Sequence, residues 1–226
     1  MFSDPYYWWE GGAVFDSLID YSALTGDKQF DDLIGEALVH QSDSEFDFLP
    51  KNQTRSIGND DQSYWGLAAM SAAEHNFPTS KLGNRTWIDL AKNVWNSQVQ
   101  RWDEESCHGG FHWQIFQFNN GYTYKNTVSQ GQFMLLSARL AKFTGNSTYS
   151  DWAQKVFKWT QDIGFVDDGF HVYDGADSVK DCTKIDQVQW TSNNGIFTEA
   201  AALMFNLVSV SHTPFICVDP RGDYMD

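Results

Sequence analysis

The stretches YSALTGDKQF (residues 21–30) and LAKFTGNSTY (residues 140–149) repeat one pattern at two places in the chain. Each begins as the end of a helix, passes through a Thr-Gly turn and a polar cap, and ends at an aromatic residue of a new helix. Glycine adopts the left-handed conformation that closes a helix, so this turn joins two consecutive helices closely. The repeat therefore predicts helical hairpins.

Apolar residues at spacings of three and four predict further helices on both sides of these turns. The predicted helices span residues 5–25, 27–38, 59–77, 87–102, 126–143, 152–163 and 195–207. Long polar connections separate the pairs, at residues 43–59, 103–125 and 166–194. Short turns on one side and long loops on the other are typical of a toroid of helical hairpins, an all-α (α/α)6 barrel whose loops would hold a site. Strand-like alternation at residues 111–116 predicts a short hairpin arm within one loop.

The seven predicted helices are fewer than the twelve of a complete (α/α)6 toroid, so we expect an incomplete barrel. We assign residues 1–207 to the partial barrel domain and residues 208–226 to a disordered tail, of the kind that translation past a misjudged exon boundary would produce. We expect Ile196, Ala200, Leu203 and Leu207 to face a missing neighbour. Because apolar surface in water is unfavourable, the chain is expected to aggregate and to be poorly active.

The composition argues against several classes of partner. The 30 acidic and 15 basic residues give a net charge of −15, which disfavours nucleic acids and anionic membranes. The 10 Trp, 9 Tyr and 17 Phe in 226 residues suggest flat apolar surfaces, which stack well on neutral sugar rings. No run of about 18 apolar residues is present, so the sequence predicts no transmembrane helix.

Three N-glycosylation sequons favour the secretory route, and they begin at Asn52, Asn84 and Asn146. The chain opens without the basic and apolar regions of a signal peptide, so we expect its natural N-terminus to be missing. The three cysteines are too few for a disulfide scaffold. Cys107, His108 and His112 form only a weak metal pattern without a fourth ligand, so we predict neither a metal nor a cofactor.

Two adjacent acids follow Gly58 and Asn59 at the predicted start of the third helix. One interpretation is structural: Asn59 caps the helix, while Asp60 and Asp61 favour the positive end of its dipole. The other is catalytic, because two carboxyl groups about 5–6 Å apart suit a retaining glycosidase. Repulsion would raise the pKa of one carboxyl group, and helix N–H groups would stabilise the other as an anion. Tyr64 and Trp65 follow the two acids by four residues and could offer sugar platforms.

An ordered set of motifs extends this pattern along the chain. The motifs are PYYWWEGGA (5–13), LIDY (18–21), TGD (25–27), GNDDQ (58–62), GGFHWQI (109–115), NGYTYKN (120–126), VYDGAD (172–177) and QWTSNNG (189–195). Together they resemble glycoside hydrolase family 76, which contains endo-acting α-1,6-mannanases and fungal cell-wall mannosidase-like proteins. The resemblance covers about residues 5–206. It implies an (α/α)6 barrel, a secreted or cell-wall location, and hydrolysis or transfer at α-1,6-linked mannose.

The resemblance also implies roles for individual residues. Asp60 matches the nucleophile of the family and Asp61 its acid/base. The predicted substrate-binding residues are Trp8, Trp9, Tyr64, Trp65, Trp113, Gln114, Tyr124, Lys125, Asn126, Asp174, Trp190 and Asn193. For several of them a structural role is the alternative: core packing for the tryptophans, a helix cap for residues 124–126, and a turn for Asp174.

The family usually has a cysteine shortly after its Lys-Asn motif, where this chain has Ser129. The sequence therefore leaves the pairing of the cysteines open. Cys107 with Cys182 is one alternative, and Cys217 is the third cysteine.

The predicted function is that of a retaining glycosidase or transglycosidase on α-1,6-mannan, and a monomer is expected. In a fungus the substrate could instead be the mannose core of glycosylphosphatidylinositol-anchored proteins, with wall glucan as the acceptor. A non-catalytic mannan-binding or wall-assembly protein, or a non-functional fragment, is the main alternative. An unrelated (α/α)-barrel lyase or uronate hydrolase would need basic residues near its loops, and this chain has few.

Overall fold

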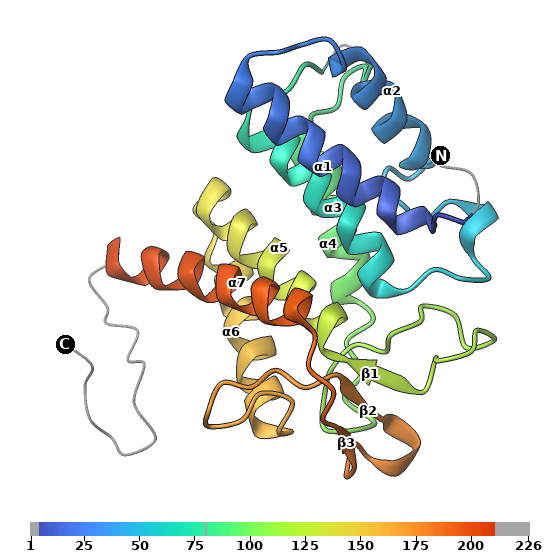
Figure 1. Cartoon of the computed structure of the whole chain (residues 1–226), viewed down its shortest axis with the longest axis vertical. Coiled ribbons are helices and arrows are strands. Elements are labelled where there is room, and N and C mark those ends of the chain that lie inside the picture. The colour runs from blue at the N-terminus through green and yellow to red at the C-terminus, as the bar shows by residue number, and fades with distance from the viewer. Residues whose placement is uncertain (1–4, 80, 211–226) are drawn as a thin grey trace.

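The computed structural model describes residues 5–79 and 81–210, and α-helices dominate this part of the chain (Figure 1). The helices are α1 (Trp8–Thr25), α2 (Asp31–Gln41), α3 (Asn59–Glu74), α4 (Trp87–Val99), α5 (Thr127–Thr144), α6 (Ser147–Asp162) and α7 (Thr191–Val210). Two short 3-10 helices cover Lys51–Gln53 and Ser178–Lys180. Three short strands add β1 (Tyr124–Asn126), β2 (Gly175–Asp177) and β3 (Ile185–Asp186).

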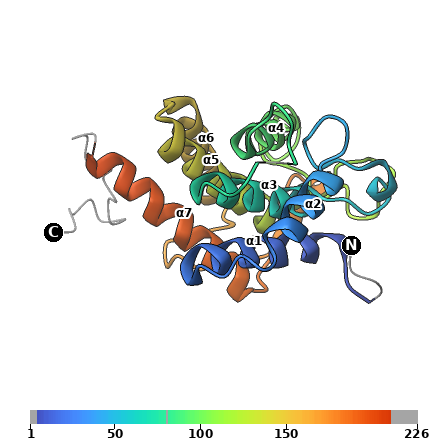
Figure 2. The same cartoon turned by 90° about the horizontal axis from the view of Figure 1, so that it is seen from above.

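The helices form two layers. In the inner layer α1 packs on α3, α3 on α5, and α5 on α7. The outer helices follow the inner ones in the sequence, and Figure 2 shows α4 and α6 on the side of α3 and α5 that faces away from α1 and α7. Successive pairs of an inner and an outer helix are the architecture of an (α/α)6 barrel, and the structure confirms the predicted partial barrel.

The two Thr-Gly turns end α1 and α5 as the sequence predicts. Gly26 and Gly145 lie in the left-handed region, with φ of 77° and 70°, and their N–H groups donate to the carbonyls of Ser22 and Ala141. The side chain of Asn146 then caps α6. These turns place each outer helix directly after its inner helix.

The inner helices α1 and α3 run in the same direction and approach closely. Trp8 of α1 stacks on Trp65 of α3, with ring centroids 5.2 Å apart, while Asp20 contacts His75 at the other ends of the helices. A Cβ atom on Gly12 would lie 3.0 Å from the backbone nitrogen of Trp65, so a side chain at this position would push the helices apart. The aromatic core is therefore built between parallel inner helices.

The loop structure differs from the predicted hairpin arm. Residues 111–116 form no strand; Gln114 makes a single backbone bridge to Gly58, and a three-stranded antiparallel sheet forms from β1, β2 and β3. The register places Lys125 opposite Ala176, which brings the second and third long loops together. The Cys107–Cys182 disulfide joins the same two loops, so Cys107 has no thiolate free for a metal. Cys217 lies outside the described residues.

Helix α7 differs from its prediction in both extent and orientation. It begins at Thr191 and reaches Val210, so the predicted boundary at residue 207 falls inside a helix, while residues 211–226 lie outside the described part. Ala200 is buried, and Ile196, Leu203 and Leu207 pack against the core. The face predicted to meet a missing neighbour is thus the packed face, and Ala201 and Ala202 are exposed instead. Among the described helices, none is long and apolar enough to cross a membrane.

Candidate active site

The acid pair lies in the first turn of α3. Gly58 is the N-cap, and its backbone N–H donates to Oδ2 of Asp61 at 2.6 Å, so Asp61 caps its own helix. A Cβ atom on Gly58 would lie 2.2 Å from Oδ1 of Asp60 and 2.9 Å from the carbonyl oxygen of Trp113. Only glycine therefore fits between the acid pair and the loop that carries Trp113.

Asn59 fixes this turn from behind. Its backbone N–H donates to the carbonyl of Trp113 at 2.8 Å, and its side-chain amide donates to the carbonyl of His112 at 2.8 Å. Its side-chain oxygen accepts from Nε of Arg101, also at 2.8 Å. Arg101 itself is held by Ser97 and Gln62, and burial lowers its pKa to about 10, so it stays cationic at neutral pH. The capping role predicted for Asn59 is thus taken by Gly58 and Asp61, while Asn59 anchors the turn.

Both acids hold protons more firmly than an exposed aspartate does. Burial, followed by the charge of Asp61, raises the pKa of Asp60 well above its usual value, against hydrogen bonds from the backbone and from Trp113. Burial also raises the pKa of Asp61 to about 6, and the hydrogen bond from Gly58 opposes that shift. Oδ1 of Asp60 is buried and finds no hydrogen-bond partner among the described residues. A carboxyl pair in which both pKa values are raised is suited to acid–base chemistry.

Aromatic side chains from α1 and α3 lie beside the pair. Tyr64 is half-buried one helical turn after Asp60, and Trp9 stacks on it with ring centroids 4.7 Å apart. Burial and then the charges of Asp60 and Asp61 raise the pKa of Tyr64, so its hydroxyl stays protonated. Gln132 of α5 lies near that hydroxyl and opposes this rise in its pKa. Neither polar atom of the Gln132 amide has a hydrogen-bond partner among the described residues.

The three long loops meet around Trp113 and Asp174. The indole of Trp113 packs over Gly121, and its backbone N–H donates to the carbonyl of Tyr124 at 2.6 Å. The hydroxyl of Tyr124 and the indole N–H of Trp190 donate to the two oxygens of Asp174, at 2.7 and 2.9 Å. Trp190 is 54% exposed and so presents its ring to solvent. Tyr124, Asp174 and Trp190 therefore form one cluster, which the backbone contact of Tyr124 connects to Trp113.

Lys125 does not contact substrate as predicted, because its side chain is completely buried. Its ammonium group lies 2.9 Å from Oδ2 of Asp103 and donates to the carbonyls of Asp103, Ser106 and Gly109. Hydrogen bonds from Ser106 and Lys125 outweigh burial and lower the pKa of Asp103 below its usual value. Lys125 thus holds the 103–109 loop in place.

Several other predicted contact residues are also structural. Trp8 and Trp65 belong to the core, where the indole of Trp8 donates to Gln41. The remaining ones are buried and bonded internally: Asn126 caps α5, Asn193 donates to Thr127, and Gln114 accepts from Asn119. The accessible or half-buried members of the predicted set are Trp9, Tyr64, Trp113, Tyr124, Asp174 and Trp190.

Two residues of the site escape sequence reasoning. Arg101 is 42 residues from Asn59, and Gln132 lies in the middle of α5. Gln132 follows Ser129 and Gln130 and precedes the apolar residues 133–136, so no sequence signal sets it apart. The three sequon residues Asn52, Asn84 and Asn146 are all exposed, as glycosylation requires.

Among the described residues, no group of three or more His, Cys, Asp and Glu is placed to hold a metal ion.

The fold and the site define a class: an (α/α)6-barrel protein with two carboxyl groups at the start of an inner helix, below loops rich in aromatic residues. The sequence profile described as glycosyl hydrolase family 76 matches residues 1–212. The chain belongs to this family, as the resemblance of its motifs predicts.

Known relatives agree with this assignment. The chain is 45% identical over 206 residues to a putative mannan endo-1,6-alpha-mannosidase of Schizosaccharomyces pombe, covering 91% of this chain and 47% of that protein. It is also 45% identical over 208 residues to the mannan endo-1,6-alpha-mannosidase DCW1 of Saccharomyces cerevisiae, covering 91% and 46%. The chain therefore spans about half the length of these relatives.

Solved structures share the fold. Dfg5 from Chaetomium thermophilum, in complex with glucosamine, superposes with a TM-score of 0.87 at 42% identity, covering 90% of this chain and 50% of that one. An inactive variant of the α-1,6-mannanase of Salegentibacter sp. HEL1_6, in complex with α-1,6-mannotriose, gives a TM-score of 0.72 at 21% identity, covering 90% and 56%. At that lower identity the likeness concerns the fold alone.

Proposed function

We propose that the chain provides the catalytic half of a retaining glycosidase or transglycosidase that acts on α-1,6-linked mannose. The observation that carries the proposal is the half-buried Asp60–Asp61 pair, held by Gly58 and Asn59 beside the stacked rings of Trp9 and Tyr64. The names of the fungal relatives support mannan as the substrate.

In the proposed reaction the Asp60 carboxylate attacks the anomeric carbon, and Asp61 donates its proton to the departing glycosidic oxygen. Asp61, now ionised, then takes a proton from water or from a sugar hydroxyl, whose oxygen displaces Asp60 from the anomeric carbon. Burial raises the pKa of both carboxyl groups, which favours the retention of a proton within the pair for the first step.

Removal of either carboxyl group should lower the rate by several orders of magnitude. With azide and an activated α-mannoside, we expect β-mannosyl azide from Asp60→Gly and α-mannosyl azide from Asp61→Gly, because azide replaces the nucleophile in one variant and water in the other. Asp168→Asn is the control, since Asp168 is an exposed carboxylate on the last long loop. A product of inverted configuration from the unchanged chain would contradict the mechanism.

Mannan binding without turnover by the unchanged chain would instead identify a mannan-binding wall-assembly protein. We further propose an extracellular or cell-wall location, which the exposed Asn52, Asn84 and Asn146 support. A glycosylphosphatidylinositol glycan as donor and wall glucan as acceptor fit the same chemistry. The chain would be incubated with the donor in the presence and in the absence of wall glucan. The masses of the products would then distinguish transfer to glucan from hydrolysis by water.

A further inference from the structure

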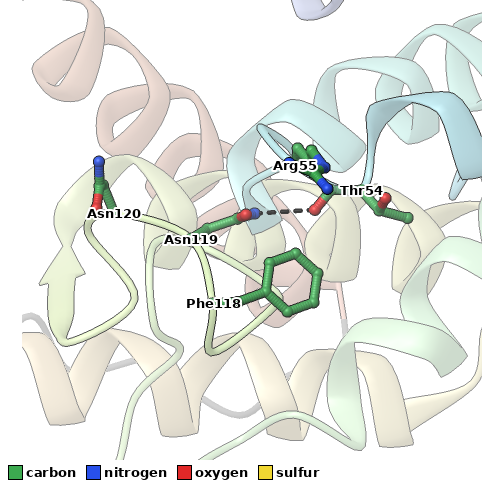
Figure 3. Close-up of a pocket in the computed structure, with 5 residues that line it drawn as sticks. All are labelled: Thr54, Arg55, Phe118, Asn119 and Asn120. Atoms are coloured by element: carbon green, nitrogen blue, oxygen red, sulfur yellow. Dashed lines mark hydrogen bonds between the residues drawn. The ribbon is translucent and has the colours of Figure 1, made fainter.

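A separate hollow of about 580 Å³ lies outside the acid-pair site, between the segment that follows the first 3-10 helix and the loop before β1 (Figure 3). Its lining residues are Thr54, Arg55, Phe118, Asn119 and Asn120. The catalytic proposal uses none of these residues. Arg55 and Phe118 approach the hollow from two segments that are far apart in the sequence (Figure 3).

Phe118 is 70% exposed, yet it stands on a firmly held turn. Its ring stacks on Phe116 with centroids 5.3 Å apart and an angle of 11° between the planes. The side-chain amide of the buried Asn119 donates to the carbonyl of Thr54 at 3.0 Å and to Oε1 of Gln114 at 3.1 Å. The turn therefore presents a flat apolar ring to solvent that does not contribute to the core.

The polar groups around the ring are donors and amides. Arg55 and Asn120 are exposed at the rim, and none of the five lining residues carries a carboxylate, although the chain has 30 acidic residues. A hollow at the C-terminal end of α4 is lined by Asp103, Glu104 and Glu105 instead. A flat apolar ring bordered by a guanidinium and by amides matches a hexose, which has an apolar C–H face and a rim of hydroxyl groups.

We propose that this hollow is a second carbohydrate subsite, which binds a hexose unit of a neutral glycan chain. The two segments that line the hollow also contact the acid-pair site.

Gln114, which accepts from Asn119, pairs with Gly58 in a backbone bridge, and the N–H of Ile115 donates to the carbonyl of Ile57 at 3.2 Å. A glycan bound here is thus held by the segments that end at the acid pair. A role of this hollow in binding substrate or acceptor rests on the proposed function, whereas its binding of a glycan does not.

The test measures binding without turnover, in an Asp60→Asn/Asp61→Asn background. Calorimetric titration with α-1,6-linked mannooligosaccharides and with β-1,3-linked glucooligosaccharides of increasing length shows which neutral glycan binds. We expect Phe118→Ala to weaken binding of the preferred longer chains about ten-fold, the effect of losing one stacking ring, and to leave the shortest chains unaffected. Phe118→Trp should retain the affinity.

Phe170→Ala is the matched control, because Phe170 is a 59% exposed phenylalanine on a different loop. Equal affinities of Phe118→Ala and of the Asp60→Asn/Asp61→Asn background for every glycan would overturn the subsite.

Thr54 also completes the sequon of Asn52, so the protein's own glycan could fill the hollow. Phe118-dependent binding by an Asn52→Gln variant of secreted protein, absent from its glycosylated parent, would confirm that the hollow binds a glycan. It would overturn the role of the hollow in substrate or acceptor binding, because the protein's own glycan occupies it. Phe118-dependent binding without hydrolysis by the unchanged chain would overturn the proposed function alone.

Discussion

Asp61 serves both as the cap of α3 and as half of the acid pair, and these roles favour opposite charge states. As a cap it accepts the N–H of Gly58, which favours the anion. Burial favours the protonated form of Asp61 instead. Burial has the larger effect, and the pKa of Asp61 therefore rises to about 6. The cap of α3 thus keeps a raised pKa, and the protein bears an energetic cost at neutral pH.

Replacement of Asp61 by Asn should relieve this cost. The pKa of Asp61 in the folded chain lies above that of an exposed aspartate, so the folded chain binds more protons than the unfolded chain. The stability therefore falls as the pH rises from about 4 to about 6. At pH 7 we expect Asp61→Asn to raise the free energy of unfolding by on the order of 3 kcal/mol, since the amide oxygen can still accept from Gly58. The gain should vanish near pH 3. Urea denaturation at both pH values measures it, and a less stable variant at pH 7 would contradict this account.

At the scale of elements, Lys125 connects β1 to the loop after α4. Its buried ammonium satisfies three carbonyl groups and the carboxylate of Asp103, which also contacts His112 at 3.0 Å. The backbone of His112 and Trp113 in turn holds Asn59. One buried cation therefore connects the sheet to the start of α3 through a chain of hydrogen bonds.

We expect Lys125→Met to lower the free energy of unfolding by about 3–5 kcal/mol, because it leaves several carbonyls without their donor and Asp103 without its cation. Lys158→Met is the matched control. Lys158 pairs with Asp162 on the surface of α6 and is 75% exposed, so its loss should cost less than about 1 kcal/mol. Chemical denaturation of both variants gives the comparison, and equal stabilities would refute the organising role of Lys125.

At the scale of the whole molecule, a charged cluster joins the inner helices. Arg139 of α5 donates to both carboxylate oxygens of Glu74 of α3, at 3.2 and 2.7 Å, and to the hydroxyl of Ser71 at 2.8 Å. Asp16 of α1 and Glu199 of α7 raise the pKa of Arg139 further. Each of the four inner helices thus contributes a charged side chain to one cluster.

Arg139→Met should destabilise the barrel by about 3–5 kcal/mol at pH 7, since it leaves Glu74 and the buried Asp16 without their cation. The loss should be smaller at pH 4, where carboxyl groups freed of the arginine take up protons. Asp16→Asn is the control and should be neutral or stabilising at pH 7, because burial raises the pKa of Asp16. Thermal unfolding at the two pH values tests this, and a loss that is larger at pH 4 would disprove it.

Features that depend only on neighbouring residues could be predicted from the sequence. The Thr-Gly turns at Gly26 and Gly145, the helices that they join, and the acid pair at the start of α3 are all encoded within a few residues. Hydrogen bonds within one helical turn and apolar spacing along one face decide these features locally.

Which side chains face the site depends on how the helices and loops pack together. Trp8 and Trp9 are adjacent and chemically identical, yet Trp8 is buried against Trp65 while Trp9 stacks on half-buried Tyr64. Lys125 and Arg101 are cations whose sequence surroundings reveal nothing of their burial, which the loops and helices packed over them produce. Burial depends on contacts between residues that are distant in the chain, and no local pattern records them.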